Sequence, residues 1–130
     1  MAKMLSVLIP KIGVSALDST YISRDKAVVE AYVNDPLDYT GKLSARVGAE
    51  LLKTMEKLQS EISKLSLPIL IMHGTADRIS DPSSSQMLYD GVSSKDKTLK
   101  LYEGFYHEIF NDPGRQQVFS DMDEWLKKHI

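Results

Sequence analysis

Apolar residues in the second half of the chain mark two strands and two helices in alternation. The run 69–72 is apolar at every position, which is typical of a parallel strand buried on both faces. Residues 98–102 alternate apolar and polar side chains, which indicates a second strand. Between them, Asp81-Pro82 predicts a helix start, with aspartate at the cap and proline in the first turn. The order strand, helix, strand, helix predicts the α/β class with two parallel strands.

The two helices of this half are recognised by their apolar faces and their ends. Gly91 suits the end of the first helix, and lysines in the last turn of the second suit the helix dipole. The apolar faces are formed by Met87, Leu88 and Val92 in the first helix, and by Val118, Phe119, Met122, Trp125 and Leu126 in the second.

The first half, to about residue 66, has the pattern of helices and loops. Ser23 is the expected cap of a short helix that reaches Tyr32. The run 34–36 (Asn-Asp-Pro) ends it, because the residue before a proline avoids the helical region. A longer helix follows, and its apolar stripe consists of Leu43, Val47, Leu51, Met55, Leu58, Ile62 and Leu65. We therefore predict a helical region over 1–66 and an α/β unit over 67–130.

Composition narrows the class of protein further. The 130 residues are 42% hydrophobic and 26% charged with a net charge of −2, which is typical of a soluble globular protein. Basic residues do not form a stripe interleaved with aromatics, so nucleic acid is not an expected partner. The chain has no cysteine, which excludes a disulfide scaffold, a thiolate metal site and a cysteine nucleophile.

The apolar run at 4–9 is too short for a membrane span and is a poor match to a signal peptide. We expect a cytoplasmic protein.

Two loops carry the residues best suited to chemistry. Asp77 comes shortly after the first predicted strand, and His107 shortly after the second. The carboxyl ends of parallel strands meet at one edge of a sheet, so we expect these side chains to lie within reach of each other. An aspartate bound to one imidazole nitrogen fixes the tautomer and leaves the other nitrogen free as a general base.

Other polar residues have structural interpretations beside functional ones. Asp81 is a rival for the acid, but its place before proline favours a helix cap. His73 ends a buried strand and is interpreted as structural, whereas His129 lies near the terminus and is expected to be exposed. Arg78 fits either a surface position or an ion pair. A metal site formed by His73, Asp77, Asp81 and His107 matches no known ligand spacing, so neither a metal nor a cofactor is expected.

Several segments together resemble a known family. Residues 67–78 (LPILIMHGTADR) and 97–107 (KTLKLYEGFYH), with shorter matches at 18–20, 23–24 and 34–37, resemble the monoacylglycerol lipase and lysophospholipase branch of the α/β-hydrolase fold. The resemblance implies that Asp77 is the acid and His107 the base of a Ser-His-Asp triad. It also implies that residues before about 65 are a cap that covers the site and helps to accept an acyl chain.

The sequence departs from that family in one respect. In that family, the nucleophilic serine lies in a G-x-S-x-G turn ahead of the acid and the histidine. The 130 residues of this chain contain no such motif. The loop that forms the oxyanion hole also lies earlier in that family. We therefore expect the chain to be the C-terminal part of a serine hydrolase that acts on acylglycerol or lysophospholipid-type esters, and to be inactive by itself.

A second, non-enzymatic interpretation stays open. Without further strands, the first predicted strand would have one bare edge, which is a template for another chain. Such a chain would be a self-associating α/β module that acts only as an interaction domain. In either case we expect a homo-oligomer or a complex with a missing N-terminal part, and peripheral membrane contact through the cap stays open.

Overall fold

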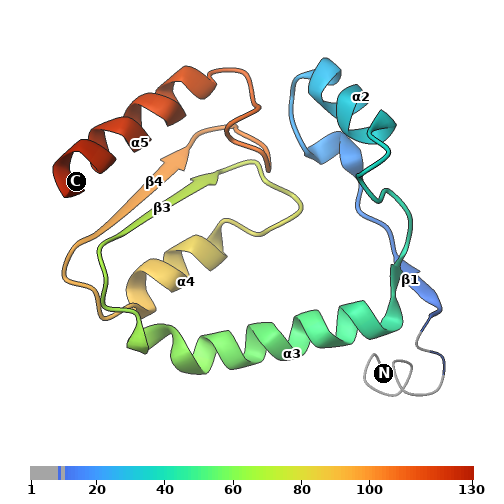
Figure 1. The fold of residues 1–130 in the computed structure, drawn as a ribbon, viewed down its shortest axis with the longest axis horizontal. Coiled ribbons are helices and arrows are strands. Elements are labelled where there is room, and N and C mark those ends of the chain that lie inside the picture. Colours follow the sequence, from blue (N-terminus) through green and yellow to red (C-terminus); the bar gives the residue numbers. More distant parts are fainter. Residues whose placement is uncertain (1–8, 10) are drawn as a thin grey trace.

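The computed structural model describes residue 9 and residues 11–130. In its first half, the elements are β1 (Gly13–Ser15), the 3₁₀ turn η1 (Ser19–Tyr21), α2 (Lys26–Asn34), β2 (Leu43–Ser44), α3 (Ala45–Glu61) and the 3₁₀ turn η2 (Ile62–Lys64). In its second half, they are β3 (Ile69–Gly74), α4 (Ser83–Gly91), β4 (Lys97–Tyr102) and α5 (Arg115–His129). Figure 1 shows α4 and α5 on the two sides of the β3–β4 pair, and the long α3 passes beside α4, where Gln59 contacts Met87.

Strands β3 and β4 are parallel neighbours, which confirms the predicted α/β class. Their register runs from Ile69 opposite Lys97 to Gly74 opposite Tyr102. Each strand is longer than predicted: backbone pairing continues beyond the apolar run of β3 into His73 and Gly74, and β4 begins one residue earlier, at Lys97 opposite Ile69. Within β3 only Ile71 and Gly74 are buried, since in the described part of the chain β3 has a neighbouring strand on one edge alone. The prediction of a strand buried throughout is therefore wrong.

The two faces of the sheet contact different helices. Met72 packs against a core cluster formed by Tyr102, Ile109 and the fully buried Val118 of α5. His73, the next residue along the strand, points to the other face, where its ring contacts Ser85 of α4. Alternation of side chains along the strand thus divides the unit into an apolar core beside α5 and a polar network beside α4.

The cap of α2 differs from the prediction. The Asp25 carboxylate, not Ser23, accepts the backbone N–H of Ala27 at 2.9 Å and so begins the helix. Ser23 is buried, and its hydroxyl donates to the carbonyl of Asn111 and to the carboxylate of Asp112. The helix ends at Asn34, directly before the Asp35-Pro36 pair that was expected to stop it.

The long helix also starts and ends inside its predicted range of 43–65. Leu43 and Ser44 form the short strand β2, which pairs antiparallel with β1. The Ser44 hydroxyl then accepts the N–H of Val47, and α3 follows as far as Glu61. Much of its apolar stripe is half exposed, with fractions of 49–57% at Val47, Leu51, Met55 and Leu58. Only Ala45 and Ala49 of this helix are buried.

The expectation that His129 is exposed is wrong. Its ring stacks on Trp125 with 3.8 Å between the centroids. Its Nε2 lies 2.9 Å from the Asp96 carboxylate in the loop before β4, and its side chain is only 18% exposed. The last turn of α5 therefore packs against the loop that leads into β4.

A buried carboxylate joins the two halves of the chain. Asp112 is inaccessible to solvent and accepts the backbone N–H and the Nε–H of Arg24, at 2.6 and 2.7 Å. It also accepts the N–H of Tyr106 at 3.1 Å. Beside it, the N–H of His107 donates to the Tyr21 carbonyl. The segment preceding α2 is thus held against the loop that carries His107.

The boundary predicted at residue 66 stays a prediction. None of the helices in the described ranges is long and apolar enough to cross a membrane. The apolar run that was compared with a signal peptide lies outside the described residues, apart from Ile9.

Replacing Asp112 with asparagine is expected to lower the free energy of unfolding by about 2–3 kcal/mol, because the amide presents a donor to groups that all donate. Asp123→Asn is the matched control, since Asp123 pairs with Lys127 on the exposed face of α5. That change is expected to cost less than about 0.5 kcal/mol. Urea unfolding followed by circular dichroism measures both, and equal effects would contradict the structural role of Asp112.

Candidate active site

The loops after β3 and β4 are joined by backbone contacts. The N–H of Thr75 donates to the Tyr102 carbonyl at 2.9 Å, and the N–H of Ala76 donates to the Phe105 carbonyl at 3.0 Å. Gly74 permits this approach, because a side chain there would collide with the carbonyl oxygens of Phe105 and Tyr106. The two loops that carry Asp77 and His107 therefore form one edge of the sheet.

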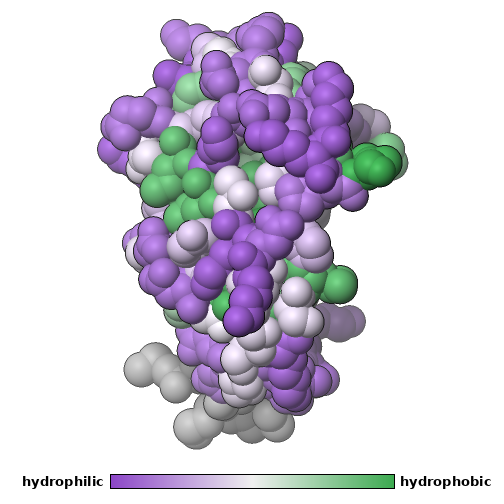
Figure 2. Space-filling model, turned by 90° about the vertical axis from the view of Figure 1, so that its left-hand side faces the viewer, coloured by the Kyte–Doolittle hydropathy of each residue, from purple (hydrophilic) through white to green (hydrophobic). Residues whose placement is uncertain are grey.

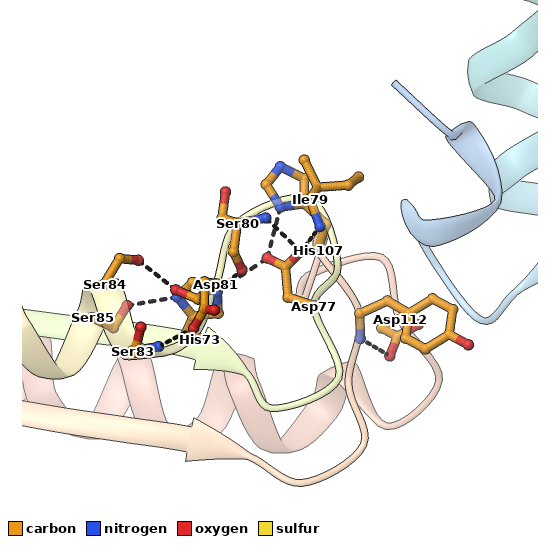
Figure 3. A network of polar contacts seen from close by, with 11 residues as sticks. His73, Asp77, Ile79, Ser80, Asp81, Ser83, Ser84, Ser85, His107 and Asp112 are labelled. Atoms are coloured by element: carbon orange, nitrogen blue, oxygen red, sulfur yellow. Dashed lines mark hydrogen bonds and ion pairs between the residues drawn. The ribbon is translucent and has the colours of Figure 1, made fainter. Parts of the chain in front are cut away.

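Asp77 and His107 meet at this edge, as expected from the strand ends. The Nδ1 atom of His107 lies 2.8 Å from Oδ2 of Asp77 (Figure 3). A carboxylate oxygen only accepts, so Nδ1 carries the proton, and Nε2 is then the free basic nitrogen of a neutral ring. The Asp77 side chain is 3% exposed and that of His107 is 36% exposed. The carboxylate of the pair is thus buried, whereas the imidazole is partly exposed to solvent.

The Asp77 carboxylate is held in its ionised form. Burial acts to raise its pKa, but donors from His107 and from the backbone N–H groups of Ser80 and Ile79 outweigh burial and lower the pKa below its ordinary value. The two backbone donors bind Oδ1 at 3.0 and 2.7 Å. The other oxygen, Oδ2, is left to face the histidine.

A second histidine, His73, belongs to the same cluster. From the sequence it was interpreted as structural. His73 Nε2 lies 3.0 Å from Oδ2 of Asp77, the oxygen that also binds His107. Its Nδ1 lies 2.6 Å from the Ser85 hydroxyl. One signal for this contact was present in the sequence: His73 stands at the carboxyl end of the strand that leads to Asp77.

The remaining candidates lie beside the pair. Asp81 accepts the N–H of Ser83 at 2.9 Å, but the N-cap of α4 is Pro82, so the prediction that Asp81 is the cap and Pro82 lies in the first turn is one residue off. Arg78 donates to the Tyr21 hydroxyl at 2.8 Å and covers that ring, which is a cation–π contact rather than an ion pair. Across residue 9 and residues 11–130, the histidine, aspartate and glutamate side chains form no group of three that could hold a metal ion.

Comparison with known proteins places this chain in a family. The family model described as serine aminopeptidase, S33, matches residues 1–114. The chain belongs to this family. Over 99% of its length it is 39% identical to a monoacylglycerol lipase of Mycolicibacterium smegmatis, of which it covers 46%. It is 33% identical to the human monoglyceride lipase over 98% of its length, and covers 43% of that protein.

A solved structure agrees with the fold. The crystal structure of a monoacylglycerol lipase from Paleococcus ferrophilus matches 99% of the chain with a TM-score of 0.88 and 34% identity. The match covers 51% of that structure. The fold is therefore a partial α/β-hydrolase domain, and the chain spans about half the length of the relatives it matches. The catalytic roles of Asp77 and His107 stay predictions.

The lowered pKa of Asp77 predicts a pH-dependent part of the stability. A depressed folded pKa stabilises the fold above the unfolded value, about 3.9, and this contribution is lost as the pH falls through the folded value. The difference in unfolding free energy between the wild type and Asp77→Asn is therefore expected to be constant near neutral pH and to shrink below about pH 4. Urea titrations between about pH 6 and pH 3 measure it, and a constant difference across that range would contradict the lowered pKa of Asp77.

Proposed function

We propose that this chain supplies the acid and the base of a carboxylic ester hydrolase that acts on acylglycerol-type substrates. The observation that carries the proposal is the 2.8 Å contact between the buried Asp77 and the Nδ1 atom of His107, whose side chain is 36% exposed. A buried carboxylate that orients an exposed imidazole is the arrangement that activates a serine hydroxyl. The family and the names of its relatives support the same reaction class.

In the proposed mechanism, Nε2 of His107 removes the proton of a serine hydroxyl while that oxygen attacks the ester carbonyl carbon. Asp77 stabilises the imidazolium without taking its proton. The imidazolium then protonates the leaving alcohol oxygen as its bond to the carbonyl carbon breaks, which leaves an acyl-enzyme. Water repeats the sequence, with His107 as the base, and releases the carboxylic acid.

The nucleophilic serine is proposed to come from outside these 130 residues, in the same polypeptide or in another. The support for this is the lack of a G-x-S-x-G motif in the sequence, since that turn presents the nucleophile in this fold. The accessible side of His107 is where such a serine would have to approach.

The substrate class is proposed from a groove of about 570 Å³ between α2 and Tyr106, the residue before His107. Val29 and Val33 of α2 line it together with the charged residues Lys26 and Glu30. The surface of the groove is mainly apolar, which suits the acyl chain of an ester. Monoacylglycerol and monoglyceride are the substrates in the names of the relatives, and they are the first candidates here.

The 130-residue chain alone is expected not to hydrolyse p-nitrophenyl esters or monoacylglycerol above background, because the base has no hydroxyl to activate. Turnover by the chain that is abolished in His107→Ala would show that another nucleophile exists. Addition of the N-terminal part of the M. smegmatis relative is expected to restore hydrolysis, and that part alone serves as the blank.

In a complex that regains activity, Asp77→Asn is expected to lower the rate on the order of 10⁴-fold, since the imidazole loses its orienting acid. Asp81→Asn is the matched control, because Asp81 lies in the same loop and its carboxylate accepts the N–H of Ser83 instead of binding His107. An unchanged rate in the Asp77→Asn complex would remove Asp77 from the acid role.

Self-association is the second candidate function, and two observations favour it. In the described residues, β3 pairs only with β4, so one edge of this apolar strand has no strand beside it. The α3 stripe adds Val47, Leu51 and Met55 at about half exposure. Figure 2 shows hydrophobic surface among hydrophilic residues on one side of the molecule. Pairing of two β3 edges across a two-fold axis would form a four-stranded sheet with an antiparallel centre.

A dimer is the expected state at low micromolar concentration, with twice the 14.6 kDa mass of the chain. Leu51→Glu, on the stripe, is expected to shift the dimer towards monomer. Lys53→Glu, which is exposed but lies off the stripe, is the control and is expected to leave it intact. Light scattering coupled to gel filtration measures the mass, and a wild-type value near 14.6 kDa would exclude self-association.

A further inference from the structure

Two histidines bind the same carboxylate oxygen. Oδ2 of Asp77 lies 2.8 Å from Nδ1 of His107 and 3.0 Å from Nε2 of His73. The His73 side chain is only 12% exposed. The proposed reaction uses His107 alone, so the second imidazole needs a separate explanation.

The neighbours of His73 determine its tautomer. Nε2 faces Oδ2 of Asp77 and, at 3.1 Å, the carbonyl oxygen of Ser80, and both of these atoms are acceptors. Nε2 must therefore carry a proton. In a neutral ring Nδ1 is then an acceptor, and the Ser85 hydroxyl at 2.6 Å donates to it. All three contacts are satisfied by one neutral form of the ring.

We propose that His73 is a positioning residue for the acid–base pair: its Nε2–H holds Oδ2 of Asp77 opposite Nδ1 of His107. This inference rests on the proposed function. The carboxylate is fixed at Oδ1 by the N–H groups of Ile79 and Ser80, and at Oδ2 by His73, independently of His107. Asp77 therefore keeps its orientation when His107 gains and loses a proton.

His73 and the Ser85 hydroxyl that donates to it both lie on regular elements rather than on loops. His73 belongs to β3, and Ser85 lies in the first turn of α4 (Figure 3). Asp77 itself lies in the loop between these elements. A donor on a strand, braced by a hydroxyl on a helix, restricts the motion of the loop carboxylate more than a contact within the loop could.

The test measures the ring nitrogens by ¹⁵N NMR of the 130-residue chain at neutral pH. The wild type is expected to show His73 with its proton on Nε2 and His107 with its proton on Nδ1. In His73→Leu, the ratio of the Nδ1–H to the Nε2–H tautomer of His107 is expected to fall about tenfold, the scale of one hydrogen bond to a charged group. His73→Gln, whose amide places an N–H donor near the position of Nε2, is expected to restore the ratio.

His129→Gln is the matched control, because His129 also contacts a carboxylate but lies at the end of α5. It is expected to leave the His107 tautomer ratio unchanged. A wild-type His73 with its proton on Nδ1 alone would overturn the proposal without any variant, and so would a wild-type ratio in folded His73→Leu. If His73→Leu does not fold, Ser85→Ala replaces it and is expected to shift the ratio in the same direction by a few-fold. An unchanged ratio in Ser85→Ala would then overturn the proposal.

Kinetics in the active complex separate this inference from the proposed function. His73→Leu is expected to lower kcat about tenfold with little change in KM, and His73→Gln to recover most of it. If Asp77→Asn leaves the rate unchanged, the proposed function fails while the NMR coupling stands. If Asp77→Asn abolishes turnover but neither the His107 tautomer ratio nor kcat responds to His73→Leu, the positioning role fails and the proposed function stands.

Discussion

The geometry of the candidate site depends on one buried anion, the Asp77 carboxylate. A charge removed from water is unfavourable unless donors replace the lost hydration. The described residues supply these donors from three places: His73 on β3, the backbone of Ile79 and Ser80, and His107 on the loop after β4. The carboxylate therefore ties a strand end, a turn and a second loop together. The same contacts that satisfy its charge also orient the exposed imidazole.

A second buried carboxylate, that of Asp112, fixes the backbone around His107. Asp112 accepts from Arg24 and Tyr106, and so joins the segment before α2 to the loop that contains His107. His107 lies between the two acids: Asp77 binds its side chain, while Asp112 binds the preceding backbone N–H. Its own N–H reaches the Tyr21 carbonyl. The position of the base is thus set by both halves of the chain, although its chemistry depends on the second half.

The predicted parts of the fold are those that depend on local pattern. The apolar run 69–72, the alternation at 98–102 and the Asp81-Pro82 start gave the order of elements, and the shared edge of parallel strands brought Asp77 to His107. The missed features depend on distant contacts. Ser23 was expected to cap a helix, but its hydroxyl binds residues 88 and 89 positions away. His129 was expected to be exposed, but it contacts Asp96, which is 33 positions earlier. His73 was interpreted as structural, and the contact of its Nε2 with Asp77 depends on the path of the loop between them, which the sequence pattern does not specify.

The acid and base are preorganised independently of any nucleophile. Every donor that the structure gives to the Asp77 carboxylate lies between His73 and His107, and Asp77 is closed while the imidazole stays accessible. Apolar surface is left uncovered at the β3 edge and on the α3 stripe. The stripe reaches the acid–base cluster, since Met55 and Leu58 line the same pocket as His73 and Ser85. A partner segment that covers those surfaces would therefore meet an acid–base pair whose geometry is already set. Under the proposed function, assembly would add the nucleophile without having to reorder the imidazole, which limits the entropy lost in forming a complete site.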